Sequence, residues 1–435
     1  MANINNYQCP CCTGPMRFDG NTGKVVCDYC DTTMDVAEVE ALSKERAEKI
    51  DAAAKSTWKV DDEIVDWGQG SEAGMKAYSC PQCGAELVCE EHTAATCCPY
   101  CGNQTVIENQ FKGALKPEYI IPFKTDKEKA IAALKNHYKG KALLPKTFVD
   151  GNHIEEIQGV YVPFWLYDGE AEGDFVYKAS NTKTQSIPGG REKITDHYIV
   201  RRQGKLKFEK VPADASSRMP DTHMDSIEPF DYKELKEFST VYMPGFLADR
   251  YDVEAKDCAS RMEDRCEKTL IEAIDKTVKY DDKDNVRQDI IVKRDKVHYA
   301  MLPVWMLNTK WNGKDYLFAM NGQTGKLTGD LPVDWGKFWG NFFITLAIAL
   351  AVMIGFTAAV THGFDPEIMG SGNVFVMMVI PLAIAFIRCM ILKAAHKSVY
   401  TPLATAYITE DGLDLKIKTD QFIRQTKEVI MDKKE

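Results

Sequence analysis

Two long apolar runs near the C-terminus dominate the hydrophobic pattern of the chain. The first covers residues 338–360 and is interrupted only by small or weakly polar side chains such as Asn341. The second covers residues 374–392 and contains Arg388 close to its end. Each run is long enough to cross a hydrocarbon layer as a helix, and the Arg388 side chain is expected to extend to the membrane interface. The pattern predicts a transmembrane helical hairpin over residues 338–392.

The charges around these runs predict the orientation of the hairpin. The connecting loop, residues 361–373, contains Asp365 and Glu367 but no Lys or Arg. Lysines flank the outer ends of the hairpin, namely Lys326, Lys337, Lys393 and Lys397. Positively charged flanks stay in the cytoplasm, so both termini, including a tail at residues 393–435, are expected there. A buried helical pair in a soluble core is the alternative, and it would not need this charge asymmetry.

Apolar and polar positions also repeat between residues 111 and 333. The segment VPFWL at residues 162–166 matches LPVWM at residues 302–306, at an offset of 140 residues (302 − 162), and a glycine and an aromatic-rich strand follow each. The same offset matches two apolar helical faces, at residues 130–134 and 270–274. The pattern predicts a duplicated α+β region in which each unit has one helix and one β-hairpin.

The two predicted α+β units occupy residues 111–240 and 241–333. Each contains one Trp beside a Pro-containing strand segment, Trp165 in the first and Trp305 in the second. Large aromatic side chains in this position are usually anchors of the core, and we interpret both residues in this way. The alternative is that the two indole rings stack on a ligand.

Cysteines near the N-terminus form four Cys-x-x-Cys pairs, and 14 residues separate the inner cysteines of each set of two pairs. Two such pairs can surround one tetrahedral Zn²⁺ with four thiolates. Glycines such as Gly84 after the second cysteine suit the turn, because glycine tolerates positive φ. The pattern predicts two zinc ribbons, at residues 1–33 and 78–110, with one structural Zn²⁺ each. The predicted ligands are Cys9, Cys12, Cys27 and Cys30 in the first ribbon and Cys80, Cys83, Cys98 and Cys101 in the second.

Two alternatives to this ligand assignment remain open from the sequence. A disulfide framework would need an oxidising compartment, whereas residues 1–8 contain neither the basic nor the apolar segment of an export signal. Either Cys11 or Cys97 could replace the neighbouring cysteine as a ligand, because each is adjacent to a predicted one. Zinc bound by thiolates in a reducing cytoplasm agrees best with the pattern.

The remaining segments are interpreted as a linker and a tail. Residues 34–77 form a helical and acidic linker, in which residues 35–55 lack Gly and Pro and predict a helix. Trp58 and Trp67 are expected to pack on a zinc ribbon. Alternation at residues 413–425 predicts a short hairpin that docks on the soluble part of the protein.

Charge and coordination limit what the ribbons can do. Residues 1–110 contain 8 Lys and Arg against 18 Asp and Glu, a balance of −10 that equals the net charge of the whole chain. Each zinc centre with four thiolates adds further negative charge, which disfavours binding to nucleic-acid phosphates. A Cys₄ site has no open coordination position, so the zinc cannot act as a Lewis acid. We therefore expect the ribbons to bind proteins.

No enzyme signature emerges from the sequence. No Gly-Lys dipeptide is followed by Ser or Thr as in a nucleotide-binding loop, and GxSxG and HExxH are absent. The cluster from Asp214 to Asp225, which includes Ser216, Arg218 and His223, is the best remaining candidate for an active site. A capped loop before a helix is the simpler interpretation of such a cluster. We expect the protein not to be an enzyme.

Several motifs resemble those of a family of bacterial TFIIB-type zinc-ribbon membrane proteins common in Clostridia-like Firmicutes. The motifs are YSCPQCG at 78–84, ATCCPYCGN at 95–103, IIPFKTDK at 120–127, YVPFWLYD at 161–168, DSIEPFDY at 225–232, PGFLAD at 244–249 and FAMNGQTGK at 318–326. The resemblance covers nearly the whole chain. Such sequences often carry the automatic label of a primosomal replication-restart helicase, which we reject because the chain lacks a nucleotide-binding loop.

The resemblance also implies a role. More distant relatives with zinc ribbons and a transmembrane pair look like membrane-anchored adaptors that recruit flotillin-like or phage-shock-type proteins during envelope stress. By resemblance, the chain is expected to be a multi-pass cell-membrane protein that presents its ribbons to protein partners in the cytoplasm. A membrane-tethered nucleic-acid-binding protein is the alternative function.

Overall fold

The computed structural model describes residues 116–431 apart from 152–153, 189, 244–245 and 361–370. Closer to the N-terminus it describes residues 9, 16–19, 24–27, 30, 32–39, 41, 48, 58–60, 75–80, 84, 86–90, 100 and 107–109. The predictions that fall outside these ranges concern Cys11, Cys12, Cys83, Cys97, Cys98, Cys101, Trp67, most of the predicted linker helix at residues 35–55 and most of the loop between the apolar runs.

A mixed sheet of 13 strands forms the centre of the protein. Its main path runs β11-β8-β13-β9-β12-β6-β5-β7, while β10 pairs with β9 and β16, β14 with β13 and β15, and β4 with β13. In chain order the strands are β4 (Lys59–Val60), β5 (Met75–Ser79), β6 (Glu86–Glu90), β7 (Ile107–Asn109), β8 (Tyr119–Ile120), β9 (Gln158–Ile187), β10 (Gly190–Asp214), β11 (Lys236–Glu237), β12 (Leu247–Asp249), β13 (Asp282–Trp311), β14 (Lys314–Asn321), β15 (Leu327–Thr328) and β16 (Asp414–Met431). A separate small sheet contains β1 (Met16–Asp19), β2 (Lys24–Cys27) and β3 (Thr33–Met34).

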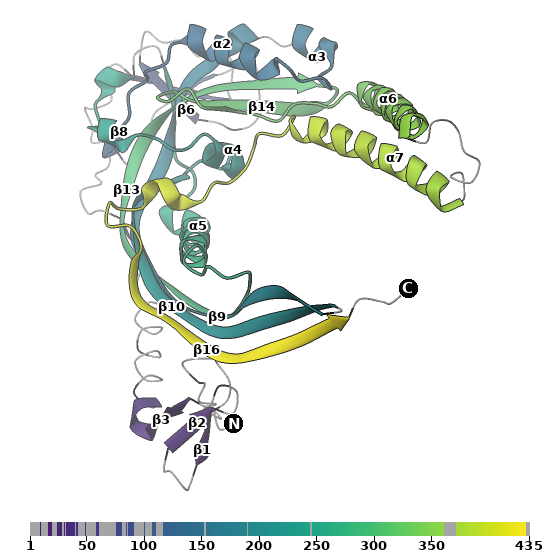
Figure 1. The fold of residues 1–435 in the computed structure, drawn as a ribbon. Coiled ribbons are helices and arrows are strands. Elements are labelled where there is room, and N and C mark those ends of the chain that lie inside the picture. The colour runs from purple at the N-terminus through teal and green to yellow at the C-terminus, as the bar shows by residue number, and fades with distance from the viewer. Residues whose placement is uncertain are drawn as a thin grey trace, which may run out of the picture.

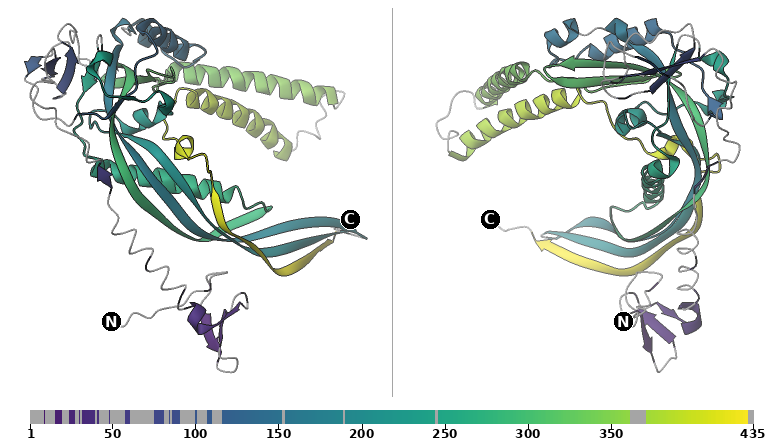
Figure 2. Two further views of the ribbon diagram at one scale, coloured as in Figure 1. Left: turned by 90° about the vertical axis from the view of Figure 1, so that its left-hand side faces the viewer. Right: turned by 180° about the vertical axis from the view of Figure 1, so that it is seen from behind.

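The long strands β9, β10, β13 and β16 form a curved sheet, and one long helix lies within the curve (Figure 1). The helices are α2 (Lys127–Tyr138), α3 (Lys146–Asp150), α4 (Asp221–Ser226), α5 (Ala255–Asp275), α6 (Trp335–Val360) and α7 (Ser371–Ala394), with a 3₁₀ turn η5 (Ala404–Tyr407). The helix within the curve is α5. Helices α6 and α7 project together from the end of the sheet near β14 (Figures 1 and 2). The fold is therefore α+β, as expected.

Alternation along β9 explains why α5 packs on the concave face of the sheet. Phe175 and Tyr177 are buried and belong to the same apolar cluster as Leu270 and Ile274 of α5. A Cβ atom at Gly173 would lie 2.5 Å from the Phe175 ring and 3.1 Å from Leu270. Only glycine at this position allows the helix to approach the strand so closely.

The two segments that match in sequence lie next to each other in the sheet. β9 and β13 pair antiparallel, and Val162 lies directly opposite Leu302. In chain order each half runs through a short strand, a helix and a long strand: β8, α2 and β9 in the first, and β12, α5 and β13 in the second. Each short strand pairs in parallel with the long strand of the other half, β12 with β9 and β8 with β13.

Both tryptophans of the matching segments are buried in the core. Trp165 is 2% exposed and donates from Nε1 to the Val253 carbonyl at 2.9 Å. Trp305 is 5% exposed and donates to Thr125 Oγ1 at 2.9 Å. Their burial confirms the interpretation as core anchors, in which the indole N–H finds a backbone or hydroxyl partner.

Two predictions about the chain ends are wrong. The alternating segment near the C-terminus forms the single strand β16 rather than a hairpin, and it pairs antiparallel with the outer edge of β10. Alternation predicts the strand but not its partner, and here the partner lies 224 positions earlier in the chain (422 − 198, for Tyr198 opposite Phe422). Among the described residues, Trp58 packs on the large sheet and not on a zinc ribbon. Its ring contacts Tyr167 edge-on at 5.0 Å, beside the pairing of β4 with β13.

Among the helices in the described part of the chain, α6 is long and apolar enough over Trp335–Phe356 to cross a membrane. Large apolar side chains along it are exposed, for example Val352 at 66%. Arg388 of α7 does not extend to the helix end as predicted, because its guanidinium donates to the hydroxyl of Thr345 on α6. The crossing of both helices as a hairpin stays a prediction.

Candidate functional site

Three of the four cysteines predicted for the first zinc ribbon lie together. The Sγ atoms of Cys9, Cys27 and Cys30 are within 4.8 Å of one another, and those of Cys9 and Cys30 are 3.7 Å apart. Thiolates bound to one tetrahedral Zn²⁺ at about 2.3 Å are roughly 3.8 Å apart, whereas a disulfide would require about 2.05 Å. The donor set and its spacing therefore fit a metal ion; the fourth predicted ligand, Cys12, is not among the described residues.

The small sheet positions this cysteine cluster. Cys27 ends β2 opposite Met16 of β1, and its N–H donates to the Thr32 carbonyl at 3.0 Å, which closes the turn that contains Cys30. The Thr32 hydroxyl lies 3.1 Å from the sulfur of Cys30. Such a turn holds two cysteines of one pair toward a common point, as a metal site requires.

The cysteine cluster also contacts the large sheet. Cys9 and Cys27, each fully buried, share an apolar cluster with Val176 of β9 and Ile199 of β10. Val176 lies between Phe175 and Tyr177, which face α5, so its side chain is on the opposite, convex face. Figure 1 shows the small sheet against this convex side, below β9 and β16. We name Val176, Ile199 and the partly buried Ile423 the convex patch.

The described strands of the predicted second ribbon belong to the large sheet. β6 pairs with β12, so the hairpin β5–β6 extends the main path, and Cys80 is fully buried in a core cluster. Gly84 has φ +73°, as the sequence predicts for the turn, and its N–H donates to the Cys80 carbonyl at 2.8 Å. The other predicted ligands, Cys83, Cys98 and Cys101, lie outside the residues that can be described.

The cluster around Asp214 and Asp225 belongs to a buried ionic network. Asp214 pairs with Arg261 at 2.7 Å, and Asp225 pairs with Arg265 at 3.6 Å. Glu228 binds Arg265 through two hydrogen bonds of 2.6 and 3.0 Å. Burial raises the pKa of Asp214 to about 6 and that of Glu228 to about 7, while the arginines oppose the shift.

This network joins α5 to the segment that leaves α7. Arg265 donates from Nε to the Pro402 carbonyl at 3.2 Å, and Thr401 donates to Asp225 at 3.0 Å. The Ala404 N–H donates to Thr269 of α5 at 2.9 Å. These contacts support the interpretation of the acidic cluster as a structural loop. In the sequence, the two arginines stand out only as two cations four positions apart on an amphipathic helix.

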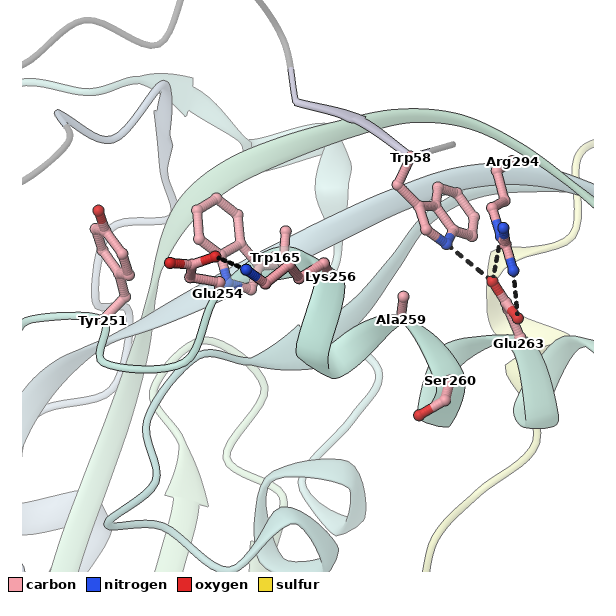
Figure 3. Close-up of a pocket in the computed structure, with 10 residues that line it drawn as sticks. Trp58, Trp165, Tyr251, Glu254, Lys256, Ala259, Ser260, Glu263 and Arg294 are labelled. Carbon is pink, nitrogen blue, oxygen red and sulfur yellow. Dashed lines mark hydrogen bonds and ion pairs between the residues drawn. The ribbon is translucent and has the colours of Figure 1, made fainter. Parts of the chain in front are cut away.

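A pocket of about 590 Å³ lies at the N-terminus of α5. Figure 3 shows Trp58, Glu263 and Arg294 at one end and Tyr251 with Trp165 at the other. Trp58 donates from Nε1 to Glu263 at 2.9 Å, and Arg294 donates to the same carboxylate at 2.6 Å. We name this site the α5 pocket.

The α5 pocket has the character of a site for an apolar group. Small side chains of α5, Ala255 and Ala259, lie between the aromatic walls, and its charged residues pair with one another, for instance Lys256 with Glu254 at 2.7 Å. Half of the ten lining residues are aromatic or alanine and half are charged or polar, and a concave site that combines apolar walls with polar groups is typical of ligand or side-chain binding. The sequence gives no sign of this pocket, because its lining residues come from four distant segments.

A second charged site holds His298 between two carboxylates. Its Nδ1 lies 2.9 Å from Glu118 and its Nε2 lies 3.5 Å from Asp168. Hydrogen bonds that the imidazolium donates to Asp168 and Glu118 raise the pKa of His298 to about 9, against the opposing effect of burial. The imidazolium therefore ties β13 to β9 and to the residue that precedes β8.

We expect His298 to make stability depend on pH in the alkaline range. Its folded pKa exceeds the unfolded value of about 6.5, so its contribution is complete below that pH and is lost as pH rises through about 9. In detergent, the thermal midpoint of the wild type should fall between pH 7 and 10 by an amount equivalent to about 2 kcal/mol more than that of His298→Gln. Parallel pH profiles of the two proteins would contradict this role.

Comparison with known proteins gives one informative match. A protein of Bacillus subtilis strain 168, described as the uncharacterised protein YdjG, is 33% identical over 336 residues, which are 77% of this chain and 92% of that protein. No protein-family model matches the chain. No solved structure matches it significantly.

Proposed function

We propose that this protein, which belongs to the same family as YdjG of Bacillus subtilis, is a membrane-anchored zinc-ribbon adaptor. In this proposal α6 and α7 cross the cell membrane as a hairpin, both termini lie in the cytoplasm, and the soluble part recruits protein partners there. Each ribbon holds one structural Zn²⁺ through its four predicted cysteines. The zinc, when bound, would fix the fold of its ribbon and supply no catalytic chemistry.

One observation carries the membrane part of this proposal. The outward surface of α6 and α7 is apolar over most of its described length, with Ile348 58%, Phe386 55% and Ile391 64% exposed. Water-soluble proteins rarely expose a continuous apolar surface of this extent. At the base of α6, Trp335 and Trp339 are about half exposed and Lys393 lies over the Trp335 ring at 5.1 Å, an arrangement typical of the membrane interface.

Two features support the adaptor role. With Cys12 as the fourth ligand, the site of Cys9, Cys27 and Cys30 would be closed and would leave no position for a substrate. In this proposal the first ribbon serves as a rigid surface above the convex patch. The α5 pocket offers an apolar, aromatic-walled concavity of the kind that anchors a partner's side chain. By resemblance, flotillin-like or phage-shock-type proteins are the proposed partners, and envelope stress is the proposed setting.

The adaptor proposal is tested by identifying what co-purifies with the protein. We expect a defined protein partner when the full chain is solubilised from its native membrane in mild detergent and analysed by mass spectrometry. If the α5 pocket anchors the partner, Trp58→Ala should reduce the amount of co-purified partner at least fivefold. If the first ribbon anchors it, the double variant Cys27→Ser, Cys30→Ser should give the same reduction.

Val241→Ala provides the matched control, because Val241 is 77% exposed and lies outside the pocket. Recovery of nucleic acid in place of a protein would favour the membrane-tethered nucleic-acid-binding alternative. A protein partner that all variants retain equally would exclude both surfaces as recruiting sites.

We also infer that the two α+β halves arose by duplication. Support comes from the matched order of strand, helix and long strand in each half and from the pairing of Val162 with Leu302, which occupy equivalent positions in the two segments. The reciprocal pairing of β8 and β12 with the opposite long strand adds to it.

A further inference from the structure

The loop between α2 and α3 lies against the base of the two apolar helices. The Asp334 N–H donates to the Leu143 carbonyl at 2.8 Å, and the Lys337 ammonium donates to the Leu144 carbonyl at 2.5 Å. Leu143 is fully buried and shares an apolar cluster with Phe338 of α6 and Cys389 of α7. The loop is therefore a fixed part of the helix base, although it comes from about 190 positions earlier in the chain (334 − 143).

This loop adds lysines to those that flank the helices in sequence. Lys139 and Lys146 are exposed, while the Lys141 ammonium donates to the Ala395 carbonyl immediately after α7. Together with the lysines of the helix ends they form what we name the basic collar. Its members are Lys139, Lys141, Lys146, Lys337, Lys393 and Lys397.

The acidic groups at the helix base are already engaged by the backbone. Asp330 accepts from the N–H groups of Ser398 and Val399, at 2.9 and 3.2 Å. Asp334 accepts from the N–H of Lys337 at 3.1 Å, as an N-cap of α6 would. In the described part of the chain, none of Lys139, Lys146 and Lys397 forms an ion pair. The exposed charge of the collar is therefore positive, although Asp150 of α3 lies nearby in sequence.

The collar lies at the level of the membrane interface that the aromatic residues indicate. Trp335 and Trp339 occupy the first turns of α6 and are 55% and 51% exposed. Lys393 contacts the ring of Trp335, and Lys141 reaches the carbonyl two positions later. Tryptophan prefers the headgroup region, so the collar lysines lie where lipid phosphates are.

We propose that the basic collar binds the headgroups of anionic phospholipids. The proposal rests on the proposed crossing of the membrane by α6 and α7, and it adds the lipid class that the soluble part recognises. Lys141 and Lys337 use their ammonium groups to cap backbone carbonyls at the helix base, which leaves Lys139, Lys146 and Lys397 for the lipids. Near an anionic surface each lysine contributes roughly a fivefold preference.

The test compares lipids that remain bound to the full-length protein. We would reconstitute it in vesicles of phosphatidylcholine mixed with phosphatidylglycerol, extract it in mild detergent and measure the bound lipids by native mass spectrometry. The ratio of bound phosphatidylglycerol to phosphatidylcholine should fall at least tenfold in Lys139→Gln, Lys146→Gln, Lys397→Gln. The triple Lys→Arg variant should retain the ratio. In the wild type, the ratio should decrease with added salt.

A matched control removes three exposed lysines from a surface away from the helix base, Lys233→Gln, Lys236→Gln, Lys268→Gln. An equal loss in this control, or no loss in the collar variant, would overturn the proposal. Carbonate extraction separates this outcome from failure of the anchor. A wild-type protein that carbonate releases would overturn both proposals, whereas one that resists carbonate but shows no lipid preference would overturn the collar alone.

Discussion

Replacing Arg265 with methionine should lower the free energy of unfolding by about 3–5 kcal/mol. Arg265 is 3% exposed, and its guanidinium binds Glu228 and Asp225 in addition to the carbonyls of Pro212 and Pro402. Without the cation, Glu228 must either remain a buried carboxylate with no compensating charge or take up a proton. The loss should be measured by chemical unfolding of the full chain in detergent.

The pH dependence of this variant gives an independent check. When the folded pKa of a carboxyl group lies above its unfolded pKa, the stability of the protein falls as pH rises between the two values. Glu228 already has a pKa of about 7 beside the arginine. Removing the arginine raises it further, so Arg265→Met should be less destabilised at pH 5 than at pH 8. Addition of Glu228→Gln should restore part of the loss, because the amide carries no charge.

Arg294→Met provides the control for Arg265→Met. Arg294 also pairs with a glutamate, Glu263, but its side chain is 32% exposed, and exposed ion pairs contribute about 1 kcal/mol or less. Similar losses in the two variants would show that burial of the network is not what makes Arg265 important. A loss below about 1 kcal/mol in Arg265→Met would contradict the structural role of the network.

Replacing Cys27 with serine should remove metal and structure from the first ribbon together. Binding of structural zinc supplies about 10–16 kcal/mol in small zinc domains, so loss of one thiolate should unfold the β1–β3 sheet. The expected result is one zinc fewer per chain by metal analysis. Hydrogen exchange should increase in β1–β3 and also around Val176 and Ile199, because the convex patch would lose its cover.

Cys11→Ser is the matched control, since Cys11 adjoins Cys12 and is the alternative fourth ligand. If Cys12 is the ligand, Cys11→Ser should retain both the metal and the protection of the convex patch. Loss of zinc in Cys11→Ser would instead assign the fourth position to Cys11. Full metal content in Cys27→Ser would contradict the site that the three sulfur atoms define.

Local signals in the sequence predicted local structure well. Cysteine spacing predicted that Cys9, Cys27 and Cys30 lie together, as they do, because two ligands in one turn fix the geometry within a few residues. Gly84 has the positive φ that its place after Cys83 predicts. Unbroken hydropathy likewise located α6, because helix length and apolar side chains are properties of one segment.

Contacts between distant segments could not be predicted in the same way. Arg265 meets Glu228 and Pro402, and His298 meets Glu118, through pairings that no short pattern specifies. Alternation in β16 indicated a strand, but its length and its neighbour depend on the open edge of β10. The α5 pocket likewise needs Trp58 beside α5, a contact that spans 205 positions to Glu263.

The place of β16 at the edge of the sheet sets an order for biosynthesis. β10 leaves the ribosome early, yet in the described part of the chain its outer edge is paired by β16 alone, which follows α6 and α7. The sheet is therefore completed only after both apolar helices have been synthesised. Until then the edge of β10 is open to other strands, so nascent chains stalled before residue 414 should depend on chaperones to avoid aggregation.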